Sequence, residues 1–161
     1  MTGWGAPGAG IEADPDALVR RAEQPDANPE RILLVVRRVE DGAMLLARWP
    51  DAQPMLLSLD APHPDEGFAE GIARLLRSRF AVTAGTPRLH AERLPVRMQH
   101  PAKGSETMGF LRVAAVEVSG EPAPDGALAG IEALTADEAA QTLSTDLERR
   151  ALALGLALLD L

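Results

Sequence analysis

Hydrophobic residues in this chain gather in short runs, and polar stretches that contain proline or glycine separate these runs. The run RILLVVRRV, which begins at Arg31, is continuous and rich in β-branched side chains, a pattern typical of a buried strand. Asp41 and Gly42 follow it and favour a hairpin turn, so AMLLARW is expected to form the returning strand. The same pattern predicts further strands in PMLLSLD, in Arg88 to Met98 with an interruption at Pro95, in Met108 to Val118, and at the start of GIEALTADEAAQTL.

Helical patterns alternate with these strands and close the chain. Phe68 to Phe80 has apolar residues at helical spacing. A second helix is expected after Thr135, because Glu138 stands three residues later and completes a capping-box pattern. Thr145 or Asp146 begins a last helix, LERRALALGLALLDL. The resulting order of strands and helices predicts an α+β fold, with a mixed sheet sandwiched between helices, and not a doubly wound fold.

The N-terminal part of the chain differs from the rest in composition. MTGWGAPGAG is rich in glycine, and the polar segment after it contains several prolines. We therefore expect a flexible segment over residues 1–29, of which the first ~12 are mobile, followed by one domain over residues 30–161. A short helix over Ala17 to Gln24 and contact of Trp4 with the domain are two further expectations for this segment.

Charge and cysteine content exclude several classes of protein. The chain has 16 Lys and Arg against 24 Asp and Glu, a formal net charge of −8, which argues against a general binder of nucleic acids or anionic membranes. It has no cysteine, which excludes disulfides and thiol chemistry and suits a cytoplasmic location. We expect no signal peptide and no transmembrane span, because the longest apolar run is too short to cross a bilayer.

The stretch DEGFAEGIARLLRSRFAV resembles the box of the Nudix hydrolase family. That box reads Gly, five residues, Glu, seven residues, Arg-Glu, an aliphatic residue, any residue, Glu-Glu, any residue, Gly and an aliphatic residue. Here Glu66 is followed by seven residues and then Arg74, while Leu76 and Val82 match the aliphatic positions. The order of elements over about residues 30–160 is similar too. The resemblance implies a Nudix fold and, in its usual form, a nucleoside diphosphate-linked pyrophosphohydrolase.

The positions that the family uses to hold a metal are replaced in this chain. In the family, glutamates hold divalent cations, usually Mg²⁺, against a pyrophosphate. The Arg-Glu pair reads Arg74-Leu75 here, and the Glu-Glu pair reads Ser78-Arg79. Mg²⁺ needs several oxygen ligands, whereas leucine offers none, serine offers one weak ligand and arginine is a permanent cation. We therefore predict no metal and no cofactor, with Glu66 and Arg74 as the retained catalytic positions. The glycines of the pattern are also replaced, by Leu59, Asp60, Asp65 and Ala81.

Three hypotheses for the function remain open. In the first, a Nudix-fold protein without the metal chemistry binds a nucleotide, another phosphorylated small molecule or a protein, with candidate ligand-binding residues Arg79, Arg48, Lys103 and Glu70. In the second, an active hydrolase holds Mg²⁺ at a relocated site made from Asp60, Asp65, Glu66 and Glu70. In the third, the chain is an unrelated α+β structural or interaction domain. The apolar last helix and the edges of an open sheet also allow a homodimer.

The charged side of the central helix has an ordinary structural explanation as well. Glu66, Glu70, Arg74 and Arg77 lie on one stripe at about 100° per residue, where they can form ion pairs in solvent. Leu75 is expected to be partly buried. The apolar side is expected to pack on the sheet, and it comprises Phe68, Ile72, Leu75, Leu76 and Phe80.

One loop gathers donors that could hold a phosphate. RMQHPAKGSE contains Arg97, His100 and Lys103, and cationic side chains on a loop are suited to binding anions. A solvated loop is the alternative. The three histidines of the chain, His63, His90 and His100, lack the spacing of a metal site.

Overall fold

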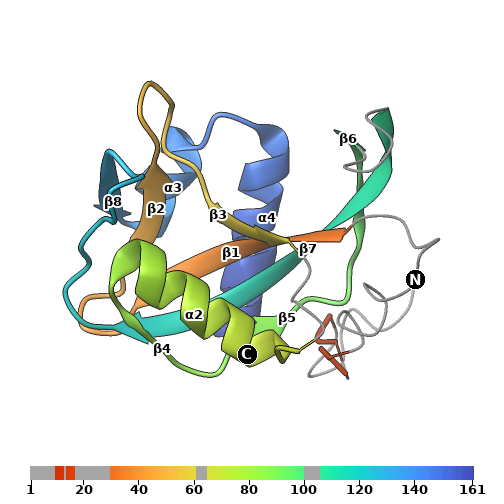
Figure 1. The fold of residues 1–161 in the computed structure, drawn as a ribbon, viewed down its shortest axis with the longest axis horizontal. Coiled ribbons are helices and arrows are strands. Elements are labelled where there is room, and N and C mark those ends of the chain that lie inside the picture. Colours follow the sequence, from red (N-terminus) through yellow and green to blue (C-terminus); the bar gives the residue numbers. More distant parts are fainter. Residues whose placement is uncertain (1–9, 13, 17–29, 61–64, 100–105) are drawn as a thin grey trace.

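The computed structural model describes residues 10–12, 14–16, 30–60, 65–99 and 106–161. In this part of the chain a curled mixed sheet carries helix α2 on one face and helices α3 and α4 on the other (Figure 1). The predicted α+β sandwich is therefore confirmed. The strands are β1 Glu30–Arg38, β2 Met44–Arg48, β3 Leu57–Asp60, β4 Thr83–Ala84, β5 Arg88–Leu89, β6 Leu94–Gln99, β7 Glu106–Ser119 and β8 Gly130–Leu134, and the helices are α2 Phe68–Phe80, α3 Ala136–Thr142 and α4 Asp146–Leu159.

The sheet is built around a long parallel pair of strands. β1 runs parallel to β7 from Glu30↔Phe110 to Arg38↔Val118, and it pairs antiparallel with β2 and β3 on its other side. β8 extends the sheet beyond β2, while β4, β5 and β6 follow one another along the outer edge of β7. The β1–β2 hairpin turns at Gly42, whose φ of 74° is readily adopted by glycine.

Alternate side chains of the central strands form two separate cores. Ile32 and Leu34 of β1 face α2, together with Ala114 and Val116 of β7. Their sequence neighbours face α3 and α4, as the side-chain period of a strand requires. On that second side α4 approaches β1 so closely that a Cβ at Gly155 would lie within 2.4 Å of a Val35 methyl group.

Helix α2 has the predicted bounds and the predicted buried side. Ile72, Leu76 and Phe80 are fully buried against the sheet, and Leu75 is half-buried at the margin of the same core, so its predicted partial burial is confirmed. None of the helices in the described residues is long and apolar enough to cross a membrane.

The second half of the sheet departs from the sequence prediction at one proline. We predicted one strand from Arg88 to Met98 that is interrupted at Pro95, but the break falls at residues 90–93 and Pro95 lies inside β6. β6 is an edge strand that pairs only with β7 among the described residues. A proline is tolerated there because an edge strand leaves half of its N–H groups outside the ladder.

Part of the N-terminal segment contacts the domain. Ile11 forms an isolated β-bridge with His90, and Glu12 accepts a hydrogen bond from Arg112 across 2.7 Å. Asp16 accepts a hydrogen bond of 3.0 Å from the backbone N–H of Phe68 and so caps α2. Residues 10–12 therefore lie along an edge of the sheet in the described structure, while the expected mobility of the segment stays a prediction. Trp4 and the helix expected over residues 17–24 lie outside the described residues.

Candidate functional site

Glu66 and Arg74, the two positions that match the family pattern, form an ion pair. Arg74 donates from Nε to Glu66 Oε2 across 2.7 Å and from a terminal nitrogen to Oε1 across 3.0 Å. This fork joins the turn before α2 to the middle of the helix, and the hydrogen bond to Glu66 raises the pKa of Arg74. The ion pair holds the turn before α2 against the helix. The catalytic role predicted for the two residues stays a prediction.

The three positions where the family places metal-binding glutamates are occupied differently. Leu75 packs against the core, and Ser78 is exposed. Arg79 donates from a terminal nitrogen to Asp125 Oδ2 across 2.6 Å, and its guanidinium carbon lies 5.1 Å from the centre of the Trp49 ring. An arginine that is held by a carboxylate and an aromatic face therefore stands at this end of the helix.

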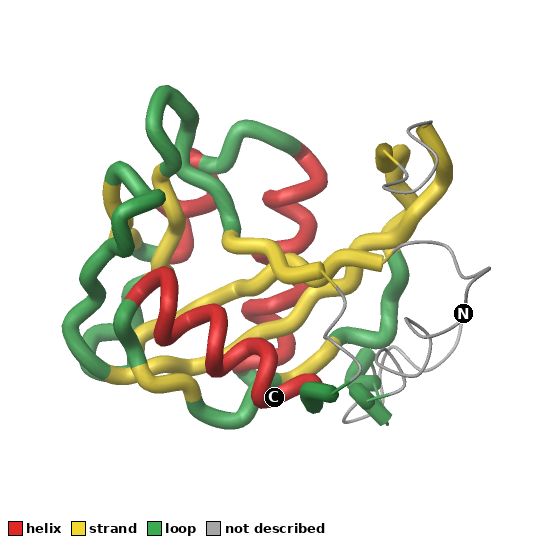
Figure 2. The backbone as a smooth tube through the Cα atoms, in the orientation of Figure 1, coloured by secondary structure: helices red, strands yellow, loops and turns green. Residues whose placement is uncertain are grey.

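Asp125 also fixes the loop between β7 and β8 against the end of α2. Its Oδ1 accepts hydrogen bonds of 3.0 Å and 3.1 Å from the backbone N–H groups of Ala127 and Leu128. Its own N–H donates to the Arg79 carbonyl across 3.2 Å, and the N–H of Ala123 donates to the Phe80 carbonyl across 2.9 Å. Figure 2 shows this loop passing the C-terminal end of the helix. Burial of the Asp125 carboxyl opposes ionisation, but the bonds from Arg79 and the two amides lower its pKa.

The residues at this site do not suit Mg²⁺. A hard divalent cation needs several anionic or neutral oxygen ligands, and here a hydrocarbon side chain, one hydroxyl and a guanidinium replace three carboxylates. Within the described part of the chain no three His, Cys, Asp or Glu side chains are placed to hold a metal ion.

The relocated metal site is not assembled in the described structure. Asp60 is largely exposed and accepts from Arg31 across 3.1 Å, whereas Glu66 is directed to Arg74. Asp65 and Glu70 are exposed. Within the described residues these four side chains do not form a group that could hold a metal ion.

The other predicted ligand-binding residues divide into two groups. Arg48 ends β2, lies 3.6 Å from Glu132 and is about half-exposed; strand alternation places its side chain on the face opposite Ala47 and so away from α2. Arg97 is exposed on β6, 3.7 Å from Glu106. Lys103 and His100 lie outside the described residues, so the predicted phosphate-holding loop is not tested.

Sequence patterns did not single out Trp49 or Asp125. Trp49 has a weak local signal, because it directly follows the strand that ends at Arg48. Asp125 has none that would link it to Arg79, because 46 positions separate the two residues. Their contact follows from the path of the β7–β8 loop.

Ala81 occupies the position of the last glycine of the family pattern. It ends α2 in a left-handed conformation with φ 58° and ψ 35°, and its N–H donates to the Arg77 carbonyl. Glycine adopts this conformation without strain, whereas a Cβ makes it unfavourable. The helix therefore ends in a conformation that favours glycine, although alanine occupies the position.

No protein-family model matches the chain, and no curated protein sequence is similar to it. Solved structures do match. A NUDIX hydrolase from Nitrosomonas europaea is 13% identical, with 81% of this chain and 89% of that chain covered and a TM-score of 0.57. An Ap4A hydrolase from C. elegans is 14% identical, with 82% and 98% covered and a TM-score of 0.57. The E. coli dihydroneopterin triphosphate pyrophosphohydrolase is 11% identical, with 76% and 91% covered and a TM-score of 0.54. These similarities show that the chain has the Nudix fold.

Proposed function

We propose that this Nudix-fold chain does not catalyse metal-dependent pyrophosphate hydrolysis and instead binds a nucleotide or another phosphorylated small molecule. The observation that carries the proposal is the ion pair between Arg79 and Asp125 at the end of α2. The family's box places a glutamate where Arg79 stands. The guanidinium supplies a positive charge of its own, so this site has a cation without a metal.

The charge arrangement supports this exchange of a metal for an arginine. A cluster of glutamates repels itself and attracts a divalent cation, whereas the pair of Arg79 and Asp125 has no net negative charge to attract a metal, and the guanidinium still presents N–H donors to an anion. Hydrolysis also needs a group that activates water beside the pyrophosphate. Leu75 and Ser78 offer neither a carboxylate for the metal nor a base for the water.

The same site retains donors for an anion. Asp125 uses one terminal nitrogen of Arg79, which leaves the edge formed by Nε and the other terminal nitrogen to meet a phosphate. Two of the solved structures of the same fold are named for phosphorylated compounds, Ap4A and dihydroneopterin triphosphate.

Thermal-shift and calorimetric titrations test the proposal. ATP, ADP and Ap4A are each added with Mg²⁺ and with EDTA to the wild type, to Arg79→Ala and to Arg97→Ala. Arg97 is the matched control because it is an exposed arginine on a separate strand. We expect binding that does not depend on Mg²⁺, that Arg79→Ala removes and that Arg97→Ala leaves unchanged.

Two other outcomes would point elsewhere. Binding that requires Mg²⁺ would favour an active hydrolase with relocated ligands. No binding of any nucleotide, with or without Mg²⁺, would contradict the proposal and leave a protein-interaction role. A triple variant, Leu75→Glu, Ser78→Glu and Arg79→Glu, offers the converse test, since restoring three carboxylates should introduce Mg²⁺-induced stabilisation if the variant folds.

Several further expectations from the sequence stay predictions. The absence of cysteine suits a reducing cytoplasm, and the negative charge disfavours nucleic acid and anionic membranes as partners. A homodimer through the last helix or an open sheet edge is checked by light scattering on the purified protein.

A further inference from the structure

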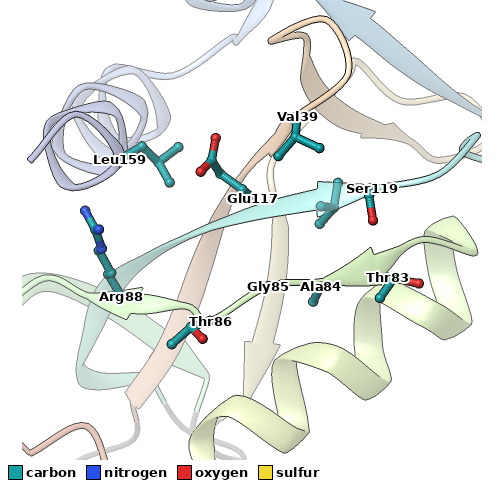
Figure 3. A pocket seen from close by; sticks show the side chains of 10 residues that line it. Val39, Thr83, Ala84, Gly85, Thr86, Arg88, Glu117, Ser119 and Leu159 are labelled. Atoms are coloured by element: carbon teal, nitrogen blue, oxygen red, sulfur yellow. The ribbon is translucent and has the colours of Figure 1, made fainter.

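A surface pocket lies on the α4 side of the sheet, between the end of that helix and strands β4 and β5. It has a volume of about 440 Å³, which is the size of small-molecule pockets in proteins. None of the predicted site residues lines it. Figure 3 shows the side chains that matter for its chemistry, which are Arg88, Glu117, Thr86, Ser119, Val39 and Leu159.

Arg88 and Glu117 place opposite charges side by side in this pocket. Arg88 is paired with Ala115 in the sheet, and Glu117 lies two residues further along β7. The two are therefore diagonal neighbours on one face, with backbones roughly 7–8 Å apart. Both side chains point toward the end of α4 in Figure 3.

Arg88 is fixed at one end and open at the other. One terminal nitrogen donates to the carbonyl of Leu158 near the end of α4. Nε and the second terminal nitrogen have no hydrogen-bond partner among the described residues. These two groups form the edge of a guanidinium that binds a carboxylate through two parallel hydrogen bonds.

Glu117 is fixed in the same manner. Its Oε2 accepts from Nε and a terminal nitrogen of Arg37 at 3.3 Å and 3.2 Å, and Arg37 is itself held by Asp160 at 3.1 Å. Oε1 of Glu117 has no partner within the described part of the chain. The pocket therefore offers an oriented carboxylate oxygen to a hydrogen-bond donor.

We propose that this pocket binds a free amino acid with an apolar side chain. The ligand carboxylate lies on the open edge of Arg88, and the ligand ammonium group donates to Glu117 Oε1. Val39, which is 53% exposed, and Leu159 lie on either side of the Glu117 carboxylate (Figure 3) and supply the apolar surface for the ligand side chain. A nucleotide is disfavoured here because Glu117 and the carbonyl end of α4 repel several phosphate charges. The proposal is thus independent of the nucleotide site at Arg79.

Titration of the full chain with blocked and unblocked amino acids tests the two charged contacts. L-leucine, L-methionine and L-phenylalanine are added to isotope-labelled wild type, and amide chemical shifts are followed. N-acetyl-L-leucine lacks the ammonium group, and L-leucinamide lacks the carboxylate. We expect L-leucine to shift the amides of Thr86, Arg88 and Ser119, and each blocked form to bind at least about tenfold more weakly, which corresponds to about 1.4 kcal/mol.

Variants test the same contacts from the protein side. Glu117→Gln and Arg88→Lys should each weaken leucine binding about tenfold or more, because lysine can still reach the helix end but cannot form the fork. Thr86→Trp should block the pocket without removing a hydrogen bond of the described structure. Glu121→Gln is the control, since its side chain is 94% exposed on the loop after β7 and outside the pocket.

Each outcome of these experiments either supports the proposal or overturns it. Loss of binding with either blocked ligand and with Thr86→Trp supports the proposal, even if the Glu117 or Arg88 variant does not fold. The absence of shifts with all three amino acids at millimolar concentration overturns it. Equal binding of blocked and unblocked leucine, or shifts confined to residues outside the pocket, also overturns it.

Discussion

Arg79 donates a hydrogen bond to Asp125 across 2.6 Å, and this contact joins the last turn of α2 to the loop between β7 and β8. Two backbone hydrogen bonds from the same loop satisfy the carbonyls of Arg79 and Phe80. The end of the helix is therefore held by its own chain. In the family pattern this region gathers carboxylates around a metal, so the ion pair gives the same part of the fold a different electrostatic character.

The coupling between these two residues can be measured with a double-mutant cycle. Arg79→Ala and Asp125→Ala should each lower the melting temperature, because each change leaves a partly buried partner without its counter-charge. The double variant should melt no lower than the less stable of the two single variants, since the second change removes a group that has already lost its partner. Differential scanning calorimetry provides the measurement. Fully additive losses would show that the pair does not stabilise this end of the helix.

Replacing Ala81 by glycine should stabilise the protein. The left-handed conformation of Ala81 is strained for any residue with a Cβ, so glycine should raise the free energy of unfolding by about 0.5–1 kcal/mol. Ala73→Gly, in the interior of the same helix, is the control and should lower it by about 0.5–1 kcal/mol. Urea denaturation of the three proteins gives both values. Destabilisation by Ala81→Gly would contradict the described end of α2.

The contact between Glu12 and Arg112 predicts a stabilising role for the N-terminal segment. Arg112 has a side chain that is only 1% exposed, and it also donates to the carbonyl of His90 at 3.0 Å and 3.2 Å. Glu12→Gln should lower the free energy of unfolding by about 1–3 kcal/mol, because a buried guanidinium loses its counter-charge. Glu121→Gln should change it little. Equal stabilities in urea denaturation would show that residues 10–12 do not hold this arginine.

His90 makes stability depend on pH. Burial lowers the pKa of His90 below its usual value of 6.5, Glu92 opposes this shift, and Arg112 and Arg150 add to it. The unfolded chain therefore takes up the proton at a higher pH than the folded one. The contribution of His90 is present above about pH 6.5 and is lost as the pH falls through the lower folded pKa.

The measurement compares the wild type with His90→Asn. In the wild type the Nδ1 of His90 accepts a hydrogen bond of 3.1 Å from the N–H of Glu92, and asparagine retains an acceptor without titrating. The wild type should lose more stability than the variant between about pH 7.5 and about pH 5.5. Parallel pH profiles would mean that His90 does not titrate in this window.

The sequence predicted those parts of the fold that depend on local patterns. The bounds of α2, the turn at Gly42 and the capping box of Thr135 and Glu138 are all encoded within a few residues, and all are present. The parallel pairing of β1 with β7 could not be predicted in the same way, because its partners lie about 80 residues apart in the chain. The strand break was predicted at Pro95 and not at residues 90–93, because whether a strand tolerates a proline depends on its place at an edge of the sheet.

The candidate site also combines features that local sequence patterns predict with contacts between residues far apart in the chain. Glu66 and Arg74 lie on the charged stripe that the sequence predicted, and the structure joins them in an ion pair. The partner of Arg79 is Asp125, which reaches it only through a loop that the strand order brings past the helix. The pocket beside Arg88 and Glu117 likewise joins residues from β5, β7 and α4, and no local pattern points to it.

The most direct test of the central claim is turnover of nucleoside diphosphate-linked compounds by the wild-type protein in Mg²⁺ and in Mn²⁺. With Leu75, Ser78 and Arg79 in the place of metal ligands, we predict no metal-dependent hydrolysis above the buffer rate and no stabilisation by either metal. Robust Mg²⁺-dependent turnover that is lost on replacing Asp60, Asp65 or Glu70 would contradict the account and establish a relocated active site.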